Sequence, residues 1–371
     1  MQAPLVTIIM AGGSGERFWP LSRRRRPKQL LRLVDDSESM LERCVRQWLP
    51  LSGPEHLFIA TNESLAEPIQ AQLPDFPTAN ILSEPTPRNT AGCLAFAAAH
   101  LLARWGDEAL KHRIAIISAD IYIGDDDALH QTVHTALQAA VEHDAIAVLG
   151  IEPVRAETGF GYIEISDREQ PDAVIDDMPV YSVHSFREKP DHNTAVEYIQ
   201  SNRFLWNSGL FFWKLSTFIE ELENVAPAYA RAIEEMRDAL QQTPPDAKAL
   251  NEAFERMPSQ SIDKALLEHA QSVYMVPAKF SWNDIGTWSS LAQALGVEEE
   301  GLNSGDPVLI DCKNVTVINQ AGAEQMAVGV VGLENVIVVA TEDGVLVCRK
   351  DRAQDVRRVV AELKHRDAPQ V

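Results

Sequence analysis

The stretch that decides the fold is VTIIMAGGSGERFWPLSRRRRPKQLL, residues 6–31. Its first residues are mostly apolar and β-branched, which predicts a buried strand. A glycine loop follows at residues 11–15, and its glycines can adopt positive φ and leave room for a ligand. Arg17, a run of arginines and Lys28 come next. A strand that ends in glycines and is followed by cations is typical of a phosphate-binding site.

The spacing of this loop excludes two common phosphate-binding motifs. No GK[ST] sequence closes it, so it is not a P-loop, and GGSGER lacks the third glycine of the G-x-G-x-x-G fingerprint. Taken alone, the glycine loop is equally compatible with a simple turn. The whole string is more specific, because G-G-S-G-x-R-x-x-P-L-S and P-K-Q occur together.

Length and charge restrict the classes of function. The 371 residues suffice for two domains, or for one large domain with an appendage. The net charge of −21 disfavours nucleic acid and anionic membranes as partners. The one basic run, residues 23–26, is either a solvated loop or a local positive field for a triphosphate. An acidic protein that binds polyanionic substrates normally also requires a divalent metal.

No segment indicates a membrane span or export. The sequence lacks a run of about 18 apolar residues, and no basic region precedes an apolar core at the N-terminus. We therefore expect a cytoplasmic protein. The cysteines at positions 44, 93, 312 and 348 are scattered. This pattern predicts buried thiols in a reducing compartment rather than zinc ligands or disulfides.

Strand-like and helix-like segments alternate through the first half of the chain. The expected strands cover 5–10, 56–60, 113–118 and 145–151, and the expected helices cover 40–48, 65–72, 91–105 and 127–143. This alternation predicts an α/β fold, a mostly parallel sheet with helices on both faces. Ligands of such sheets bind at the carboxyl ends of the strands, where the glycine loop and the acidic residue after Ser118 both fall.

Beyond residue 151 the pattern is mixed, and its composition changes near the C-terminus. The expected strands are 162–165, 180–187 and 273–277, and the expected helices are 195–201 and 217–241. Residues 296–306 indicate a linker. We therefore expect a large domain over residues 1–295 and a small β appendage with a terminal helix over residues 303–371.

The opening string resembles the signature of sugar-phosphate nucleotidyltransferases. In its GSGxRxWPLSR…PKQ form it is similar to the mannose-1-phosphate guanylyltransferases, or GDP-mannose pyrophosphorylases. Later motifs match in the family's order, so the resemblance extends over residues 6–360. It implies a Rossmann-like, GT-A-like domain followed by a short left-handed β-helix. The sequence itself shows no clear hexapeptide period in the appendage.

This resemblance implies transfer of GMP from GTP to α-D-mannose 1-phosphate, which gives GDP-mannose and pyrophosphate. Such a reaction requires the phosphates to be held, the charge at the α-phosphate to be neutralised, the attacking oxygen to be aligned and pyrophosphate to leave. No covalent enzyme intermediate is needed. Some relatives carry a further phosphomannose isomerase domain; the chain has no room for one, so we expect no isomerase activity.

The opening stretch is expected to hold the triphosphate. The resemblance implies nucleotide contacts by Ala11, Gly12, Gly13, Ser14 and Gly15. Arg17 would grip phosphate oxygens with its planar fork, and Lys28 would act as a mobile point charge. Taken alone, Lys28 would be read as a surface lysine, but the matched P-K spacing favours function. The expected catalytic residues are Arg17, Lys28, Asp120 and Asp284.

Two aspartates are expected to bind Mg²⁺. Asp120 follows a predicted buried strand, and Asp284 lies in SWNDIGTW, residues 281–288. Two carboxylates that converge on phosphate oxygens suit Mg²⁺. An aspartate after a strand is more often a turn residue or a helix cap. The family patterns P-A-D-H-x-I and W-x-D-x-G-x-W match both positions and imply ligation, with Ile121 in place of the usual histidine.

The nucleobase is expected to meet residues 83–91, SEPTPRNTA, which resemble the family's E-P-x-x-R-N-T-A motif. The resemblance implies nucleotide contacts by Glu84, Arg88, Asn89 and Thr90, together with Ser118. Free N–H groups at the start of the following helix suit a phosphate or a base. The alternative is an ordinary N-cap by Asn89 or Thr90.

Three stretches resemble the family's motifs for the sugar phosphate: ETGFGYI (157–163), FREKP (186–190) and WNSG (206–209). Gly159 would allow close approach of the sugar ring, Glu188 and Asn207 would bond its hydroxyls, and Lys189 would meet its phosphate. The alternatives are a hairpin turn, a surface ion pair and an aromatic core turn. PSQSIDK, residues 258–264, is expected to give structural support nearby.

Two other classes of function stay open. One is a related transferase for another hexose 1-phosphate or nucleoside triphosphate. The other is a non-catalytic sensor of sugar nucleotides, which would be expected to lack Arg17, Lys28 or one of the aspartates. An apolar β appendage is also compatible with a homodimer.

Overall fold

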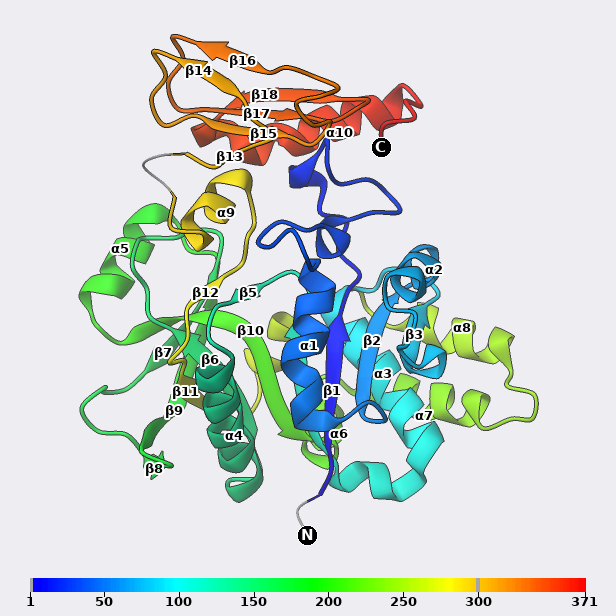
Figure 1. The fold of residues 1–371 in the computed structure, drawn as a ribbon. Helices are drawn as coiled ribbons and strands as arrows, with labels where there is room; N and C mark the ends of the chain where they lie inside the picture. Colours follow the sequence, from blue (N-terminus) through cyan, green and yellow to red (C-terminus); the bar gives the residue numbers. More distant parts are fainter. Residues whose placement is uncertain (1–2, 298–300) are drawn as a thin grey trace.

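The computed structural model describes residues 3–297 and 301–371 (Figure 1). A large α/β unit fills the lower part of the view, and a small β unit with the C-terminal helix lies above it. No helix in these residues is long and apolar enough to cross a lipid bilayer. The linker expected over 296–306 includes residues 298–300, which lie outside the described residues.

A ten-stranded sheet organises the large unit, in the order β3-β2-β1-β4-β10-β6-β11-β9-β7, with β8 paired to β9. The strands are β1 (Leu5–Met10), β2 (Leu57–Asn62), β3 (Ile81–Glu84), β4 (Arg113–Ser118), β6 (Ile146–Ile151), β7 (Gly161–Ile165), β8 (Ala173–Ile175), β9 (Met178–Glu188), β10 (Phe204–Lys214) and β11 (Val273–Pro277). β3, β2, β1 and β4 pair in parallel, as the alternation of the first half predicts.

The α/β class is confirmed, but the second half of the sheet is mixed. β10 pairs antiparallel with β4 and β6, and β9 pairs antiparallel with β7 and β11. Strands buried on both faces are apolar in either direction, so the hydrophobic pattern did not reveal this reversal. The register of β10 on β6 shifts between Asn207 and Phe211, and the first residues of β10 also pair with β7.

Helices cover both faces of the sheet, as predicted. Val6 and Ile8 of β1 pack in one apolar cluster, and Leu5 and Ile9 pack in another on the opposite face. The first cluster includes α3 (Asn89–Trp105), α6 (Leu215–Val225), α7 (Pro227–Leu240) and α8 (Ala247–Arg256). The second includes α1 (Met40–Ser52), α2 (Glu63–Gln72), α4 (Asp126–Glu142) and α5 (His192–Gln200). The helix expected over 217–241 is in fact α6 and α7, because Pro227 begins a new helix at its first turn.

The C-terminal unit consists of short stacked strands. β13 (Asn303–Ser304), β15 (Thr316–Asn319) and β17 (Val336–Ala340) pair in parallel, as do β14 (Val308–Ile310) and β16 (Gly329–Val331). β18 (Val345–Arg349) closes antiparallel on β17. Valines at 315, 317, 330 and 338 fill the space between the two small sheets. α10 (Val356–His365) lies between this unit and the large one (Figure 1).

A third apolar cluster joins the two units. Phe18 and Trp19, from the segment after the glycine loop, pack with Trp288 at the start of α9 (Trp288–Ala294). Ile337 of β17 and Val356 of α10 belong to the same cluster. The segment that follows the glycine loop is therefore anchored by the C-terminal unit as well as by the sheet.

Candidate active site

The glycine loop and Asp120 leave the sheet from neighbouring strands. β1 and β4 are parallel, and their last residues, Met10 and Ser118, pair with each other. Because the carboxyl ends of parallel strands meet at one edge, the loop after β1 lies beside the turn that carries Asp120. Both segments therefore lie at the carboxyl edge of the sheet, where ligands of such sheets bind.

The glycine loop is held in a conformation that requires Gly15. The φ of Gly15 is 59°, and a Cβ there would lie 2.5 Å from both the backbone nitrogen and the Cβ of Lys28. Below the loop, the Gln29 amide donates to the carbonyl oxygens of Ala11 (2.8 Å) and Gly13 (3.1 Å). The loop is thus fixed from its inner side, while no atom lies near the positions where Gly12 and Gly13 lack a side chain.

A two-stranded ribbon brings Asp284 to Asp120. β5 (Tyr122–Ile123) pairs antiparallel with β12 (Trp282–Asn283), so that Tyr122 lies opposite Asn283. Asp120 precedes one strand of this ribbon and Asp284 follows the other. Residues far apart in the chain therefore meet at the same end of the ribbon, as the expected metal site requires.

Lys28 lies between the two aspartate segments. It begins η2 (Lys28–Leu30), and only 4% of it is exposed. Its Nζ lies 3.1 Å from Asp120 Oδ2 and donates to the Asp284 carbonyl oxygen at 2.7 Å. The surface-lysine alternative is therefore excluded, and Lys28 is a buried cation that faces the carboxylate of Asp120.

Arg17 completes a cavity of about 360 Å³ over these groups. It lies in η1 (Glu16–Phe18), and its Nη1 donates to the Gly286 carbonyl oxygen at 3.3 Å. Its Nε is buried without a hydrogen-bond partner in the described residues. Burial lowers the pKa of Arg17 first, and the nearby Arg357 guanidinium lowers it further. All four expected catalytic residues line this cavity, as do Ser14, Gly15 and Ile121.

The two aspartates differ in their proton affinities. Burial opposes ionisation of Asp120, but the Lys28 ammonium and the Ser118 hydroxyl outweigh it, so the pKa of Asp120 lies below its usual value. Burial raises the pKa of Asp284, and the charge of Asp120 adds to this effect. A cation between the carboxylates would favour the ionised form of both.

The donor set fits Mg²⁺ with a bound substrate. Among the described residues, no group of three or more His, Cys, Asp or Glu side chains is placed to hold a metal. Mg²⁺ is commonly bound by one or two carboxylates together with substrate phosphates and water. Asp120 and Asp284 supply the two carboxylates. Burial raises the pKa of Asp284 although the Lys28 ammonium partly opposes this rise, so a further cation beside this carboxylate would favour its ionised form.

A second cavity, of about 310 Å³, continues from Asp120 toward β3. It is lined by the predicted nucleotide-binding residues Ala11, Gly12, Gly13, Glu84, Asn89, Thr90 and Ser118. Glu84 is 8% exposed, and its Oε1 has no hydrogen-bond partner in the described part of the chain. Burial raises the pKa of Glu84 to about 7, although the Cys93 thiol partly opposes this rise. An unsatisfied buried carboxyl group in a cavity is suited to a ligand that donates hydrogen bonds.

Part of the E-P-x-x-R-N-T-A motif forms hydrogen bonds with the protein backbone and so stabilises the fold around the cavity. Arg88 donates to the Met257 carbonyl oxygen at 3.2 Å, and the Thr90 hydroxyl accepts from the Ile262 N–H at 2.8 Å. Asn89 begins α3 with a φ of 61°, and its side chain accepts from the Thr90 N–H rather than capping a later turn. The motif therefore contacts residues 257–262, which overlap the segment 258–264 that the sequence predicted to be structural.

The expected sugar-binding residues form a separate cluster on β7, β9 and β10. Gly161 pairs with Glu188 across the sheet, and a Cβ on Gly161 would lie 2.7 Å from Glu188 and 3.4 Å from Asn207. The Asn207 amide donates to Asp263 at 2.8 Å. Lys189 is exposed and pairs with Glu188 at 2.7 Å. None of these residues lines the two cavities described above, so their contact with a sugar phosphate stays a prediction.

The sequence motifs did not predict the contacts of several residues near these cavities and the sugar cluster. Gly161, rather than Gly159, makes the close approach to Glu188, because the Cβ position of Gly159 lies only against Glu157. Asp263 was expected to be structural, yet it binds the side chain of Asn207. The sequence indicates Gln29 only as part of P-K-Q, although its amide holds the glycine loop, and no motif indicates Arg357, which lines the cavity.

Comparison with known proteins agrees with this geometry. The profile of the family described as Nucleotidyl transferase matches residues 6–300. The chain belongs to the nucleotidyl transferase family. A second profile, described as the MannoseP isomerase/GMP-like beta-helix domain, matches residues 305–363 and agrees with the stacked strands of the C-terminal unit.

Relatives of this nucleotidyl transferase cover almost the whole chain. The xanthan biosynthesis protein XanB of Xanthomonas campestris pv. campestris (strain B100) is 36% identical over 97% of this chain and 73% of its own. The mannose-1-phosphate guanylyltransferase of Salmonella muenchen is 35% identical with the same two coverages. A crystal structure from Thermus thermophilus, of a protein named mannose-1-phosphate geranyltransferase, has a TM-score of 0.83 and 31% identity. That alignment covers 97% of this chain and 99% of the other.

Proposed function

We propose that this nucleotidyl transferase joins GTP and α-D-mannose 1-phosphate into GDP-mannose with release of pyrophosphate. The observation that carries the proposal is the pair of cavities that share Asp120 in their linings. One of them offers Arg17 and Lys28 to a triphosphate, and the other offers a buried carboxyl group to a nucleobase. The names of the relatives support the choice of guanine and mannose.

Guanine suits the cavity of Glu84 because its N1–H and N2–H₂ groups can both donate to one carboxylate. Adenine presents an acceptor at N1, which would face the carboxylate unfavourably. The glycine loop would hold the ribose and phosphates through its backbone N–H groups. Base choice would thus depend on the charge state of a single side chain.

In the proposed reaction, a phosphate oxygen of the sugar phosphate attacks the α-phosphorus of GTP in line. The bond from that phosphorus to the bridging oxygen breaks, and its electron pair leaves with pyrophosphate. Arg17 and Lys28 offset the charge that develops on the leaving group. Asp120 and Asp284 would hold Mg²⁺, which when bound neutralises phosphate charge.

The deciding measurement is release of pyrophosphate from the purified protein with Mg²⁺, with GTP compared with ATP, UTP and CTP. With mannose 1-phosphate as the acceptor, we expect release with GTP only. Release with another triphosphate, or only with another hexose 1-phosphate, would keep the reaction class and change the substrate. No release with any pair, from folded protein that still binds nucleotide, would favour the sensor.

We predict a specific kinetic effect at the sugar cluster. Asp263→Ala removes the acceptor that orients the Asn207 amide, so the KM for mannose 1-phosphate is expected to rise about tenfold. The KM for GTP is expected to stay within about twofold, because Asp263 lies outside the nucleotide cavities. Lys264→Gln, one residue along the chain, serves as the control. Equal effects of the two variants on the sugar phosphate would contradict the assignment.

We also propose a domain boundary near residues 295–303. A homodimer is a separate proposal. The C-terminal unit exposes apolar side chains on β14, β16 and β18: Val308, Ile310, Val331, Val345 and Val347. Such a surface is compatible with a contact between two copies of the chain.

A further inference from the structure

One cation in the active-site cavity comes from the C-terminal unit. Arg357 lies in the first turn of α10 and lines the same cavity as Arg17, Lys28, Asp120 and Asp284. It lies beyond residue 300, where the match to the nucleotidyl transferase family ends. No motif of the transferase match therefore accounts for its presence in this cavity.

The packing of α10 fixes the position of Arg357. Val356 and Val360 are 2% and 4% exposed, and they belong to the apolar cluster that contains Phe18 and Trp288. Phe18 directly follows Arg17 in η1. The backbone of Arg357 is therefore held against the same core that positions Arg17.

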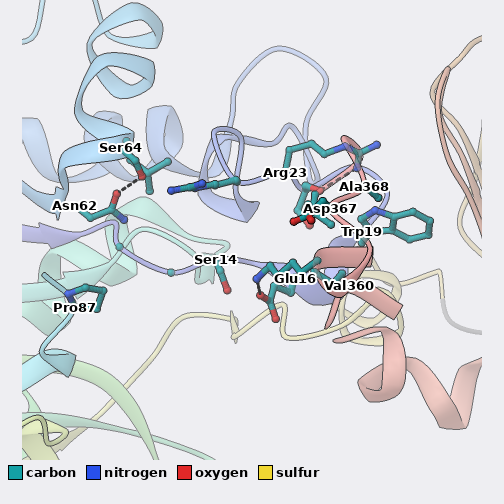
Figure 2. Close-up of a pocket in the computed structure, with 17 residues that line it drawn as sticks. Ser14, Glu16, Trp19, Arg23, Asn62, Ser64, Pro87, Val360, Asp367 and Ala368 are labelled. Atoms are coloured by element: carbon teal, nitrogen blue, oxygen red, sulfur yellow. Dashed lines mark hydrogen bonds and ion pairs between the residues drawn. The ribbon is translucent and has the colours of Figure 1, made fainter. Parts of the chain in front are cut away.

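Polar contacts hold the later turns of α10 and the chain end in place. Lys364 pairs with Glu16 of η1 at 2.5 Å, and the Trp19 indole donates to the Gln370 carbonyl oxygen at 2.9 Å. Figure 2 shows Glu16 beside Val360, and Trp19 near the chain end at Asp367 and Ala368, around a groove of about 650 Å³. The helix is thus tied at several points to the segment that follows the glycine loop.

The electrostatics of this arrangement favour an anion between the two arginines. Within residues 3–297 and 301–371, the Arg357 guanidinium makes no hydrogen bond or ion pair with another side chain. Its charge acts on Arg17, whose pKa is lowered by burial and then by Arg357. The carboxylates of Asp284 and Asp120 offset this only in part, and an anion between the two guanidinium groups would relieve their repulsion. The next residue, Arg358, instead lies 4.0 Å from Asp355 and does not line the cavity.

We propose that Arg357 binds the two terminal phosphates of the nucleoside triphosphate and then the pyrophosphate that they become. The inference deepens the proposed function, on which it rests. Arg17 and Arg357 would approach the leaving group from the two units of the chain, each with a planar fork of N–H donors. When the bond to the α-phosphorus breaks, the electron pair goes to the bridging oxygen of pyrophosphate, and both guanidinium groups offset its added charge.

The test compares Arg357→Gln with Arg358→Gln in the reverse reaction of GDP-mannose with pyrophosphate and Mg²⁺. Both variants remove one positive charge from the first turn of α10, so a general change in field is the same in each. Arg357→Gln is expected to raise the KM for pyrophosphate about tenfold or more, as for loss of hydrogen bonds between charged groups. The KM for GDP-mannose, which lacks the leaving phosphates, is expected to stay within about twofold. Arg358→Gln is expected to change neither constant.

Equal behaviour of the two variants, or an equal rise in both constants for Arg357→Gln, would overturn the assignment. A binding titration with inorganic pyrophosphate and Mg²⁺ separates this inference from the proposed function, because it requires no sugar or base. If the protein transfers another nucleotide, weaker pyrophosphate binding by Arg357→Gln than by Arg358→Gln still supports Arg357. If the unaltered protein does not bind pyrophosphate, or both variants bind it equally well, the inference is wrong.

Discussion

Asp284→Asn is expected to reduce nucleotidyl transfer by about a hundredfold to a thousandfold, the cost typical of losing a preorganised charge at a reacting phosphate. The asparagine has the same shape, and its side-chain oxygen can still accept from the Gly286 N–H, which lies 3.2 Å from Asp284 Oδ1. The loss should therefore appear in kcat rather than in folding. The measurement is the steady-state rate over a series of Mg²⁺ concentrations.

The stability of this variant provides an internal check. Burial raises the pKa of Asp284 above its value in the unfolded chain, so the carboxyl group stabilises the folded state less as the pH rises through that range. Asparagine lacks this penalty, and the melting temperature at pH 8 is expected to be unchanged or higher. Asp125→Asn, at the N-cap of α4, removes the same charge and is expected to keep full turnover. Normal turnover and metal dependence in Asp284→Asn would refute the role of Asp284 as a ligand.

Glu84→Gln is expected to lower kcat/KM for GTP at pH 8 by about tenfold to a hundredfold and to weaken the preference for GTP over ATP. The pKa of Glu84 is raised to about 7 by burial, so the carboxylate forms as the pH rises through neutrality. Only the ionised form accepts two hydrogen bonds from guanine. In the unaltered protein, kcat/KM for GTP should therefore increase between pH 6 and pH 8, an interval that brackets the pKa of about 7.

The variant should lose this pH dependence and also gain stability. The pKa of Glu84 is about 7 in the folded state and 4.5 for a free side chain, so stability present below pH 4.5 is lost as the pH rises to 7. The loss amounts to roughly 3 kcal/mol, so Glu84→Gln should melt at a higher temperature than the unaltered protein at pH 8, but not at pH 4.5. Glu164→Gln, at a buried carboxylate paired with Arg203 (3.2 Å), is the control and should leave GTP kinetics unchanged. An unaltered pH profile in Glu84→Gln would exclude Glu84 as the base-reading group.

The sequence was sufficient for the glycine loop and the residues that follow it. A β-branched run followed by glycines fixes a strand and its loop locally, and Lys28 is buried beside Asp120 and Asp284 rather than exposed on the surface. The helices on both faces were also predictable, because apolar periodicity in a helix depends on the buried face alone.

The features that the sequence did not predict depend on contacts between distant segments. β5 and β12 have two residues each, too short for a periodic pattern, yet they bring Asp284 to Asp120. The direction of β10 is not encoded in its apolar composition. Arg357 is one exposed arginine among several on an amphipathic helix, and only the packing of α10 against Phe18 shows where it lies.

The apolar cluster that joins the two units constrains how their sequences can evolve independently of each other. Phe18 lies directly after Arg17 and packs with Trp288, while Ile337 and Val356 complete the same cluster. A substitution in the C-terminal unit that shifts α10 therefore also shifts the segment that carries Arg17. Recombination that exchanged one unit for a distant counterpart would expose Trp288 to water and displace Arg17 from its cavity in one event. Selection for a functional enzyme therefore acts on both units together. We expect the coding segments of the two units to stay joined in one gene.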